Sequence, residues 1–480
     1  MSYSAAIDQL NTMAPELYTR PGQPRRKFSL DEVRILLAAL GDPQQRLRSV
    51  LIAGTNGKGS TAATLASILT ASGLRAGLYT SPHLERVNER IRINDAEIAD
   101  HDFARLFFRV DEVARRLLQE GKLPQTPSFF ELLTAQALLY FAEARVDLAV
   151  LEVGMGGRLD ATNVVDPLIS VITDISLDHT EWLGSTIAAI TREKAGILRR
   201  HGTLISLPQD PETNQVFDET AAALELRRVT AEPYLPPTID STHLYQDFSV
   251  SNLNLGAPGP DSRTWETRTP IETPVNGATI TYTVQALGAP VEVDSPLTGA
   301  HQQRNIALAI AAAVELAQSF PITPATIAQG IRQTRWPGRL ERIQASGIEW
   351  ILDVAHNPAG AWALRSGLCG LLNDQRPRSL IFSCLRDKPI NEMARILFPL
   401  FDQVIFAPIH SARAADLEDL EAAGKATGTL ALSAASVRQA LQWAAERGAG
   451  LVVISGSVYL VGEARSLLLA HGADLEGILS

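Results

Sequence analysis

Short apolar runs alternate along most of the chain with longer segments whose apolar residues recur at helical spacing. This alternation is typical of a parallel sheet whose strands are joined by crossover helices. In the first part of the chain it predicts strands at 49–53, 76–80, 147–153 and 168–175 and helices at 60–72, 130–144 and 186–199. Gly73 is predicted to end the first of these helices, and Ser128 to begin the second.

The pattern changes between residues 208 and 296, where Pro, Thr, Asn and Gly become frequent. Alternating stretches such as 278–284 predict hairpins, so we expect a β-rich extension that includes a long insertion at 255–274. A helix is predicted at 303–318, and the earlier rhythm resumes after Pro337. It predicts strands at 350–354, 379–384, 403–406 and 450–455 and helices at 359–372, 391–397 and 435–447.

The fold class is therefore α/β, with two domains. We expect a parallel-sheet domain with the β-rich extension over residues 1–334, and a smaller Rossmann-like α/β domain over residues 335–480. The length of 480 residues agrees with two domains, and the contents of 45% hydrophobic and 20% charged residues are those of a globular protein.

The net charge of -10 argues against nucleic acid as the main partner, because such proteins usually carry a basic face. A small anionic substrate is still compatible with it. The two cysteines, Cys369 and Cys384, exclude a disulfide scaffold and a cysteine zinc site. Residues 1–18 lack the basic start and apolar core of a signal peptide, and no apolar run reaches the roughly 20 residues that span a bilayer. We expect a cytoplasmic protein with no membrane partner.

The strongest chemical signal is the run Gly54-Thr55-Asn56-Gly57-Lys58-Gly59-Ser60-Thr61, which lies between a predicted strand and a predicted helix. Its glycines allow successive amides to point into one concavity, and the helix start and Lys58 add positive charge. Gly59 separates the lysine from the hydroxyls, unlike the usual P-loop order. The run predicts a polyphosphate site, with Ser60 or Thr61 available to a metal, and hence a P-loop-type ATPase domain.

Three further segments carry candidate chemistry. Glu152 ends a predicted buried strand and is followed by a glycine-rich loop, which places a carboxylate where open α/β sheets bind ligands. Magnesium prefers such oxygen ligands. His179 follows another strand end, and Lys194 lies on the next predicted helix. Taken singly, each of the three also has an ordinary interpretation: a structural carboxylate, a hydrogen-bonded histidine and a solvated lysine.

Taken in order, these segments resemble the folylpolyglutamate synthase and dihydrofolate synthase family, which is related to the muramyl peptide ligases. The stretches that carry the resemblance are Gly54–Ser60, Ser81–Leu84, Glu89–Arg90, Ser128–Glu131, Glu152–Asn163, Asp178–Gly184, Arg192–Ile197, Gly299–Asn305, Trp336–Glu341, Asp353–Pro358 and Gly456–Leu460. It runs from about Phe28 almost to the end of the chain, apart from the insertion. One departure is Phe28–Val33, where many relatives carry Leu-Gly-Leu near the pterin pocket.

The resemblance implies roles for single residues. The implied ATP-binding residues are Asn56, Gly57, Lys58, Gly59, Ser60, Asn305, Arg339 and Asp353. The implied Mg²⁺ ligands are Ser81, Glu152 and His179, with Ser60 near a second ion. Lys194 matches a lysine that carbon dioxide carbamylates, and the implied catalytic residues are Lys58, His179 and Lys194. The implied residues for the pterin-bearing substrate are Arg86, Ser128, Leu159, Asp160 and Ala161.

The activity that the resemblance implies is ATP-dependent ligation of L-glutamate to the carboxylate of dihydropteroate or a reduced folate through an acyl phosphate. Dihydrofolate synthase activity, folylpolyglutamate synthase activity or both satisfy this description, and we predict a bifunctional, monomeric enzyme. Two alternatives stay open. One is a muramyl-type amino acid ligase, and the other is a P-loop NTPase that hydrolyses ATP without an acceptor.

Overall fold

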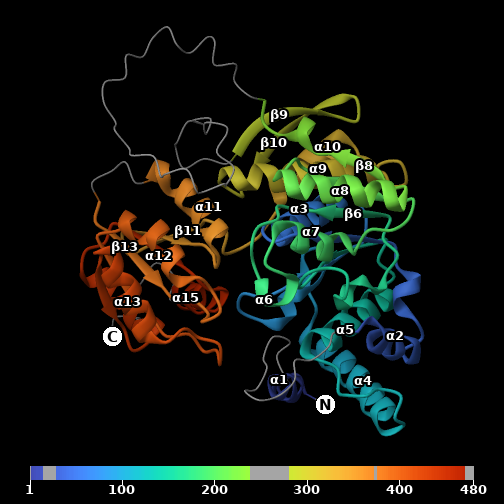
Figure 1. The fold of residues 1–480 in the computed structure, drawn as a ribbon, viewed down its shortest axis with the longest axis horizontal. Helices are drawn as coiled ribbons and strands as arrows, with labels where there is room; N and C mark the ends of the chain where they lie inside the picture. The colour runs from blue at the N-terminus through green and yellow to red at the C-terminus, as the bar shows by residue number, and fades with distance from the viewer. Residues whose placement is uncertain (1, 14–28, 238–279, 372–375, 471–480) are drawn as a thin grey trace.

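The computed structural model describes residues 2–13, 29–237, 280–371 and 376–470. These residues form two lobes and a hairpin: the first lobe is built on an eight-stranded sheet and the second on a six-stranded sheet (Figure 1). The insertion predicted at 255–274 lies outside the described residues. No helix in the described ranges is both long enough and apolar enough to cross a membrane.

The sheet of the first lobe has the strand order β4-β3-β2-β5-β1-β6-β7-β8. Its strands are β1 Ser49–Ala53, β2 Ala76–Tyr79, β3 Ile91–Ile93, β4 Ala96–Glu97, β5 Leu148–Glu152, β6 Ile169–Ile172, β7 Thr203–Ser206 and β8 Arg227–Thr230. All neighbours pair in parallel except β3 and β4 at one edge. Ile52 of β1 pairs with Glu152 of β5, so the segments that follow these two strands leave the sheet side by side.

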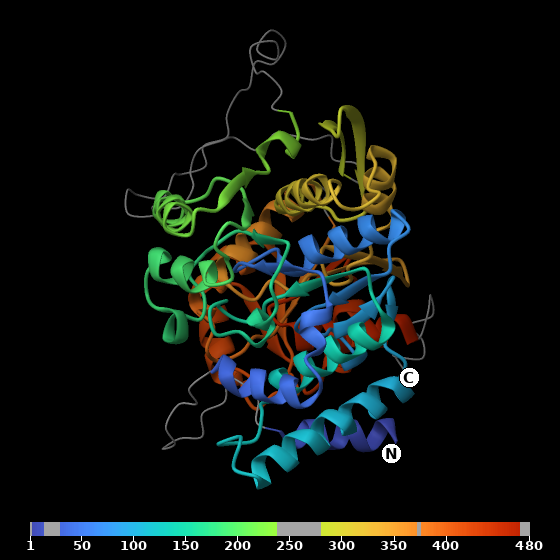
Figure 2. The same cartoon turned by 90° about the vertical axis from the view of Figure 1, so that its right-hand side faces the viewer.

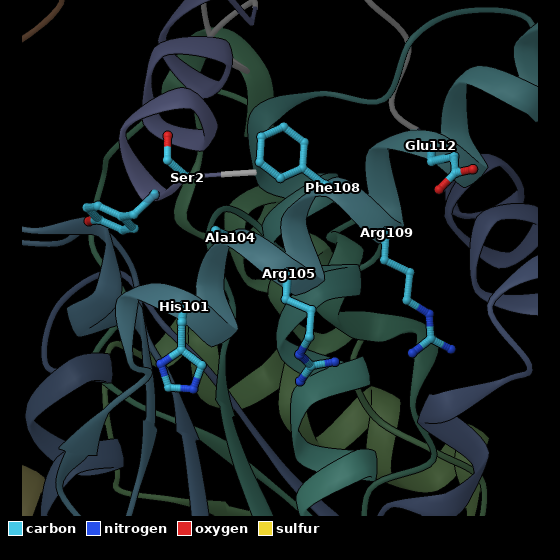
Figure 3. Close-up of a pocket in the computed structure, with 8 residues that line it drawn as sticks. Ser2, His101, Ala104, Arg105, Phe108, Arg109 and Glu112 are labelled. Carbon is cyan, nitrogen blue, oxygen red and sulfur yellow. The ribbon is translucent and has the colours of Figure 1, made fainter.

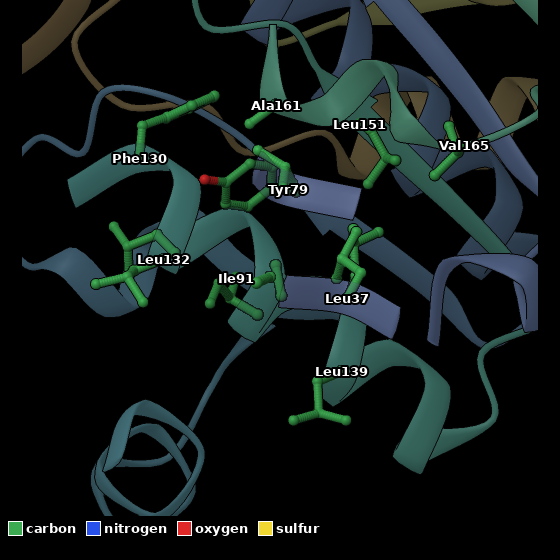
Figure 4. Close-up of a cluster of buried hydrophobic side chains, with 14 of the residues drawn as sticks. Leu37, Tyr79, Ile91, Phe130, Leu132, Leu139, Leu151, Ala161 and Val165 are labelled. Carbon is green, nitrogen blue, oxygen red and sulfur yellow. The ribbon is translucent and has the colours of Figure 1, made fainter. Parts of the chain in front are cut away.

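Helices cover both faces of this sheet (Figures 1 and 2). The helices packed in the core on one face are α1 Tyr3–Thr12, α2 Leu30–Ala39, α4 Asp100–Gln119, α5 Phe129–Ala144, α7 Ile187–Ala195 and α8 Pro211–Leu224. Figure 4 shows part of that core, where Leu37 and Phe130 pack near Tyr79. The elements on the other face are α3 Lys58–Ala71, α9 Ala300–Leu316, α10 Pro324–Gln333 and the hairpin β9 Ile280–Ala286 with β10 Ala289–Ser295.

The second lobe has the strand order β11-β12-β16-β13-β14-β15, antiparallel only at the edge strand β11. Its strands are β11 Glu341–Ala345, β12 Ile348–Leu352, β13 Arg378–Phe382, β14 Gln403–Phe406, β15 Leu430–Ser433 and β16 Leu451–Ser455. Helices α14 Val437–Glu446 and α15 Val458–Ala470 cover one face. Helices α11 Pro358–Leu368, α12 Ile390–Leu397 and α13 Leu417–Thr427 cover the other. This is the second α/β unit that the sequence predicts.

Short helices complete the connections. They are α6 Thr180–Leu183 and the 3-10 helices η1 Pro43–Arg46, η2 Val87–Arg90, η3 Ala161–Val164, η4 Glu232–Tyr234, η6 Cys369–Leu371 and η7 Phe398–Leu400.

Most predicted elements are present, with small shifts at their ends. The strands at 49–53 and 403–406 have the predicted bounds, and Ser128 caps α5 as predicted. Helix α3 begins at Lys58, two residues before the predicted start, because Gly57 takes the cap position. The stretch predicted to be β-rich contains the hairpin but opens with the unpredicted helix α8, which Asp210 caps and Pro211 begins. An aspartate before a proline is a helix-start signal, and Asp210 and Pro211 carry it here.

Candidate active site at the junction of the two lobes

The loop predicted to bind phosphate connects the end of β1 at Ala53 to the start of α3 at Lys58, and we call it the phosphate loop. Its conformation needs glycine. Gly57 has φ +86°, and a Cβ atom there would lie 2.1 Å from Asn305 Oδ1. At Gly54 a Cβ atom would lie 1.8 Å from Thr173 Oγ1. The loop is therefore packed tightly between the end of β6 and the start of α9. The first amides of α3 have no partner within the helix, so the loop presents them to an anion.

Neighbouring elements hold the loop in this shape. The backbone carbonyl of Asp174 accepts hydrogen bonds from the amides of Thr55 and Asn56, at 2.9 and 3.2 Å. The Asp174 carboxylate in turn accepts hydrogen bonds from Arg304, whose Nε lies 2.9 and 3.1 Å from the two oxygens. Lys58 Nζ donates to the Thr55 carbonyl at 3.0 Å. A preformed loop binds phosphate without a further ordering cost.

Glu152 lies beside this loop at the carboxyl end of β5. Its side chain is buried, and Oε2 accepts a hydrogen bond from the Ser81 amide at 3.1 Å. Burial raises the pKa of Glu152, and the positive charges of Lys58 and of Arg339 from the second lobe oppose the rise. The structure thus brings the predicted residues Ser81 and Glu152 together. It also brings Arg339 close enough for its charge to act on the carboxylate.

Asp178 and His179 form the next part of the site, where the two lobes touch. Asp178 Oδ1 accepts a hydrogen bond from Lys388 Nζ at 2.8 Å, and Oδ2 accepts one from Asn357 Nδ2 at 3.1 Å. Both donors belong to the second lobe, and the amide of Asn357 also donates to Asn56 Oδ1 at 3.1 Å. The phosphate loop and the 178–179 segment therefore share one contact with the second lobe.

The pKa values of Asp178 and His179 are strongly shifted from their ordinary values. Burial raises the pKa of Asp178, but its electrostatic interactions with His179, Lys388 and His356 outweigh burial and hold that pKa well below its usual range. Burial lowers the pKa of His179 to about 4, against the charge of Asp178. His179 is therefore a neutral imidazole near pH 7, the form that binds metals.

The chemistry of the predicted Mg²⁺ ligands partly meets the requirements of a metal site. The buried carboxylate of Glu152 is an oxygen ligand of the type that magnesium prefers, and a divalent cation would stabilise its ionised form. In the ranges that the structure describes, no group of three or more His, Cys, Asp and Glu side chains is arranged to hold a metal ion. The set Ser81, Glu152 and His179 therefore stays a prediction.

Lys194 is buried against the phosphate loop rather than solvated. It lies near the end of α7, and its Nζ donates to the Gly54 carbonyl at 2.6 Å. Burial and the charge of Lys58 together lower the pKa of Lys194 to about 7, against the opposing charges of Asp178 and Asp160. A large share of these amines is thus unprotonated near neutral pH, as reaction with carbon dioxide requires.

The second lobe adds Arg339 and Asp353 to the site. Asp353 follows β12, and its two oxygens accept hydrogen bonds from the amides of Leu340 and Ala355, each at 2.9 Å. Burial lowers the pKa of Arg339, and the charges of Asp353 and Glu152 oppose the change. Asn305, the other predicted nucleotide residue beyond the loop, packs against Gly57 from α9.

The residues predicted to hold the pterin-bearing substrate are Arg86, Ser128, Leu159, Asp160 and Ala161. Two of them are engaged in local structure: Ser128 caps α5, and Asp160 accepts hydrogen bonds from the amides of Met155 and Thr162. Ala161 is buried, whereas Leu159 is 37% exposed. Arg86 is half exposed and donates to Asp100 at 2.6 Å. Substrate binding by these five residues stays a prediction.

Sequence reasoning gave no role to four residues that shape the site: Asp174, Arg304, Asn357 and Lys388. Asp174 lies in the predicted strand 168–175, but the structure ends that strand at Ile172. Asp174 therefore lies in the following loop, which is hydrogen-bonded to the phosphate loop. The only signal for Lys388 was a charged pair, Asp387-Lys388, shortly after a predicted buried strand. Charged pairs of this kind are common, so the signal was not specific.

A pocket elsewhere in the first lobe is separate from this site. It has a volume of about 590 Å³ and lies between the start of α1 and one face of α4 (Figure 3). Its lining residues are Ser2, Tyr3, His101, Ala104, Arg105, Phe108, Arg109 and Glu112. None of the predicted site residues is among them, so the pocket carries no part of the chemistry described above.

Comparison with known proteins first defines the class. The Mur ligase middle domain matches residues 52–232, and the Mur ligase glutamate ligase domain matches residues 338–458. The chain therefore belongs to the Mur ligase class, with the phosphate loop in one matched region and Arg339 and Asp353 in the other.

Whole-chain relatives then define the family. The chain is 35% identical to a folylpolyglutamate synthase of Lacticaseibacillus casei, over 93% of this chain and 96% of that protein. It is 32% identical to the dihydrofolate synthase/folylpolyglutamate synthase of Bacillus subtilis, over 92% and 95%. The crystal structure of Mycobacterium tuberculosis folylpolyglutamate synthase with ADP and AMPPCP superposes with a TM-score of 0.80 at 32% identity, covering 97% of this chain and 98% of that one. The chain belongs to the folylpolyglutamate synthase and dihydrofolate synthase family.

Proposed function

We propose that this chain is an ATP-dependent ligase that joins L-glutamate to the carboxylate of a pteroate or folate and releases ADP and phosphate. The observation that carries the proposal is the convergence of Lys58, Glu152 and Lys194 with Arg339 of the second lobe at one junction. Relatives named as folate ligases support the choice of substrate. They also disfavour the muramyl-type alternative, because the folate-ligase relatives match 93% and 92% of this chain. We place the division between the two domains near residue 334.

The phosphate loop and Lys58 would bind the polyphosphate of ATP. The unpaired amides at the start of α3 and the helix dipole favour negative charge there, and Lys58 adds a full positive charge. The relative solved with ADP and AMPPCP supports ATP as the nucleotide. Asn305 and Asp353 would position the nucleotide from α9 and from the second lobe.

Glu152, Ser81 and His179 would hold Mg²⁺, with Ser60 near a second ion. A magnesium ion bound there supplies charge neutralisation for the phosphate oxygens. Lys194 is the residue that we propose to be carbamylated, because its lowered pKa leaves an unprotonated amine beside the phosphate loop. The carbamate would supply oxygen atoms in place of a cation.

In the first step, an oxygen of the substrate carboxylate attacks the γ-phosphorus of ATP, and the bond to the ADP oxygen breaks. The products are an acyl phosphate and ADP. Lys58 and Arg339 act on the charge that spreads over the transferring phosphoryl group. Arg339 comes from the second lobe, so the step requires the two lobes to be docked as they are here.

In the second step, the amine of L-glutamate attacks the acyl carbon, the amine loses a proton, and phosphate leaves through a tetrahedral intermediate. No side-chain nucleophile is needed, because the phosphate is already a good leaving group. The chain's contribution is to hold the acyl phosphate and the amine in contact and to keep water out.

The test is coupled ADP release with ATP, magnesium and L-glutamate, with product masses measured in parallel. The acceptors are dihydropteroate, a reduced folate monoglutamate, a nucleotide-linked muramyl peptide, and none. We expect release with both pterin acceptors and products heavier by one glutamate, as for a bifunctional enzyme. Release with one of the two would assign a single activity. Release only with the muramyl peptide, or equal release without an acceptor, would overturn the proposal.

A further inference from the structure

Helix α15 of the second lobe lies directly against the first-lobe segment that follows Ser81. Figure 1 shows α15 on the side of its lobe that faces the first lobe. A Cβ atom at Gly462 would lie 1.9 Å from the Leu84 carbonyl oxygen, so the two backbones touch. No other residue type fits at this position without moving the helix away from the segment.

Arg465, one turn along α15, bridges two carboxylates that belong to different lobes. Its Nη1 lies 2.5 Å from Oε1 of Glu85 in the first lobe, and its Nε lies 3.0 Å from both carboxylate oxygens of Glu341 in the second. Ser466 Oγ donates to the other oxygen of Glu85 at 2.7 Å. The side chains of Arg465, Glu85 and Glu341 are 21%, 25% and 22% exposed, so water screens the bridge only in part.

The first-lobe end of this bridge is attached to a stiff segment. Glu89 accepts hydrogen bonds from the amides of Leu84, Glu85 and Arg86, at 2.7 to 2.8 Å. The same segment begins at Ser81, whose amide donates to Glu152. A displacement of Glu85 would therefore also move Ser81, which is predicted to bind magnesium, and Arg86, which is predicted to bind the acceptor.

The second-lobe end of the bridge is attached to the nucleotide residues. Glu341 Oε2 accepts a hydrogen bond from the Gly338 amide at 2.8 Å, which fixes the turn that carries Arg339. Two residues further on, the amide of Leu340 donates to Asp353. Glu341 and Arg339 therefore move together.

We propose that Arg465 is a positioning residue that couples the acceptor segment, 81–90, to the nucleotide residues Arg339 and Asp353. This inference rests on the proposed function. A guanidinium can bridge two carboxylates at once, which a single ammonium group does less well. If the lobes separate, Glu85 loses its cation and Glu341 keeps it. The docked state, with both ligand sites assembled, is the one in which Arg465 is fully paired.

Linkage gives this coupling a measurable form: binding of a nucleotide strengthens binding of the acceptor, and the reverse, by the same factor. The experiment measures ADP affinity by titration calorimetry in magnesium buffer, with and without a saturating reduced folate monoglutamate. The proteins are the wild type, Arg465→Met, Glu85→Gln, the double variant and Arg465→Lys. Arg378→Met is the matched control, because Arg378 is 26% exposed and pairs with Asp402 inside the second lobe.

We expect the acceptor to tighten ADP binding in the wild type by about fivefold or more. Arg465→Met and Glu85→Gln should each reduce that factor to about one, and the double variant should lose no more than either alone. Affinity for ADP alone should stay within about twofold, Arg465→Lys should be intermediate, and Arg378→Met should match the wild type. An unchanged factor in Arg465→Met, or in the still-folded Glu85→Gln, would overturn the coupling, as would a wild type with no factor at all. Failure of the proposed function is distinct, because it shows as no glutamate ligation by the wild type.

Discussion

The buried amine of Lys194 gives a prediction that does not depend on the catalysed reaction. Its pKa falls from an ordinary 10.5 to about 7 because the side chain is buried beside the phosphate loop. Between these values the unfolded chain binds a proton that the folded chain has released. The free energy of unfolding therefore rises with pH over this range. Within this range the free energy of unfolding is lowest near pH 7, where about half of the folded molecules still carry the proton.

The magnitude follows from the size of the shift. Each pKa unit corresponds to about 1.36 kcal/mol, and integration from pH 7 to pH 9 gives about 2 kcal/mol from this residue alone. Lys194→Met removes the titrating group. It also leaves the Gly54 carbonyl without this donor, but that cost is the same at every pH. The difference in stability between wild type and variant should therefore change by about 2 kcal/mol in favour of the wild type over this interval.

The assay is urea unfolding of both proteins at pH 7, 8 and 9 in buffer free of carbon dioxide. Lys425→Met, at an exposed position of α13, is the control and should show no such trend. A difference between wild type and Lys194→Met that stays constant across the three pH values would refute the lowered pKa. Addition of ¹³C-bicarbonate should then give a carbamate carbon signal by NMR in the wild type that Lys194→Met lacks.

Three further predictions concern the site. Gly57→Ala should raise the KM for ATP about tenfold or more, because a Cβ atom would meet Asn305 and a left-handed φ disfavours alanine; an unchanged KM would contradict the packing of the loop. Glu152→Gln should lower kcat by about a hundredfold or more with no loss of thermal stability, since the amide removes a buried charge; near-normal turnover would exclude Glu152 from the site. Lys388→Met should lower the free energy of unfolding by about 3 kcal/mol, because it leaves the buried Asp178 without its cation; chemical denaturation measures this, and no change would show that the pair is not maintained in solution.

Most of the fold could be predicted from the chain because its signals are local. The apolar periodicity of a strand or a helix, the serine that caps α5 and the glycines of the phosphate loop each act within a few residues of one another. The loop chemistry is local for the same reason, since Lys58 and the first amides of α3 are neighbours in sequence. Helix α8, which the apolar periodicity did not predict, also has a local signal at Asp210 and Pro211.

The tertiary structure decided which distant residues share a site and in what charge state. Lys194 contacts Gly54 across 140 residues, Lys388 contacts Asp178 across 210, and Arg465 contacts Glu85 across 380. A lysine on a helix has the same local sequence signal whether its amine is solvated or buried, so its pKa follows only from the packing around it. The sequence by itself predicted a phosphate site at the loop that begins at Gly54. The docking of the two lobes determined which charges meet there, because desolvation and charge pairing depend on distances in space and not on separation along the sequence.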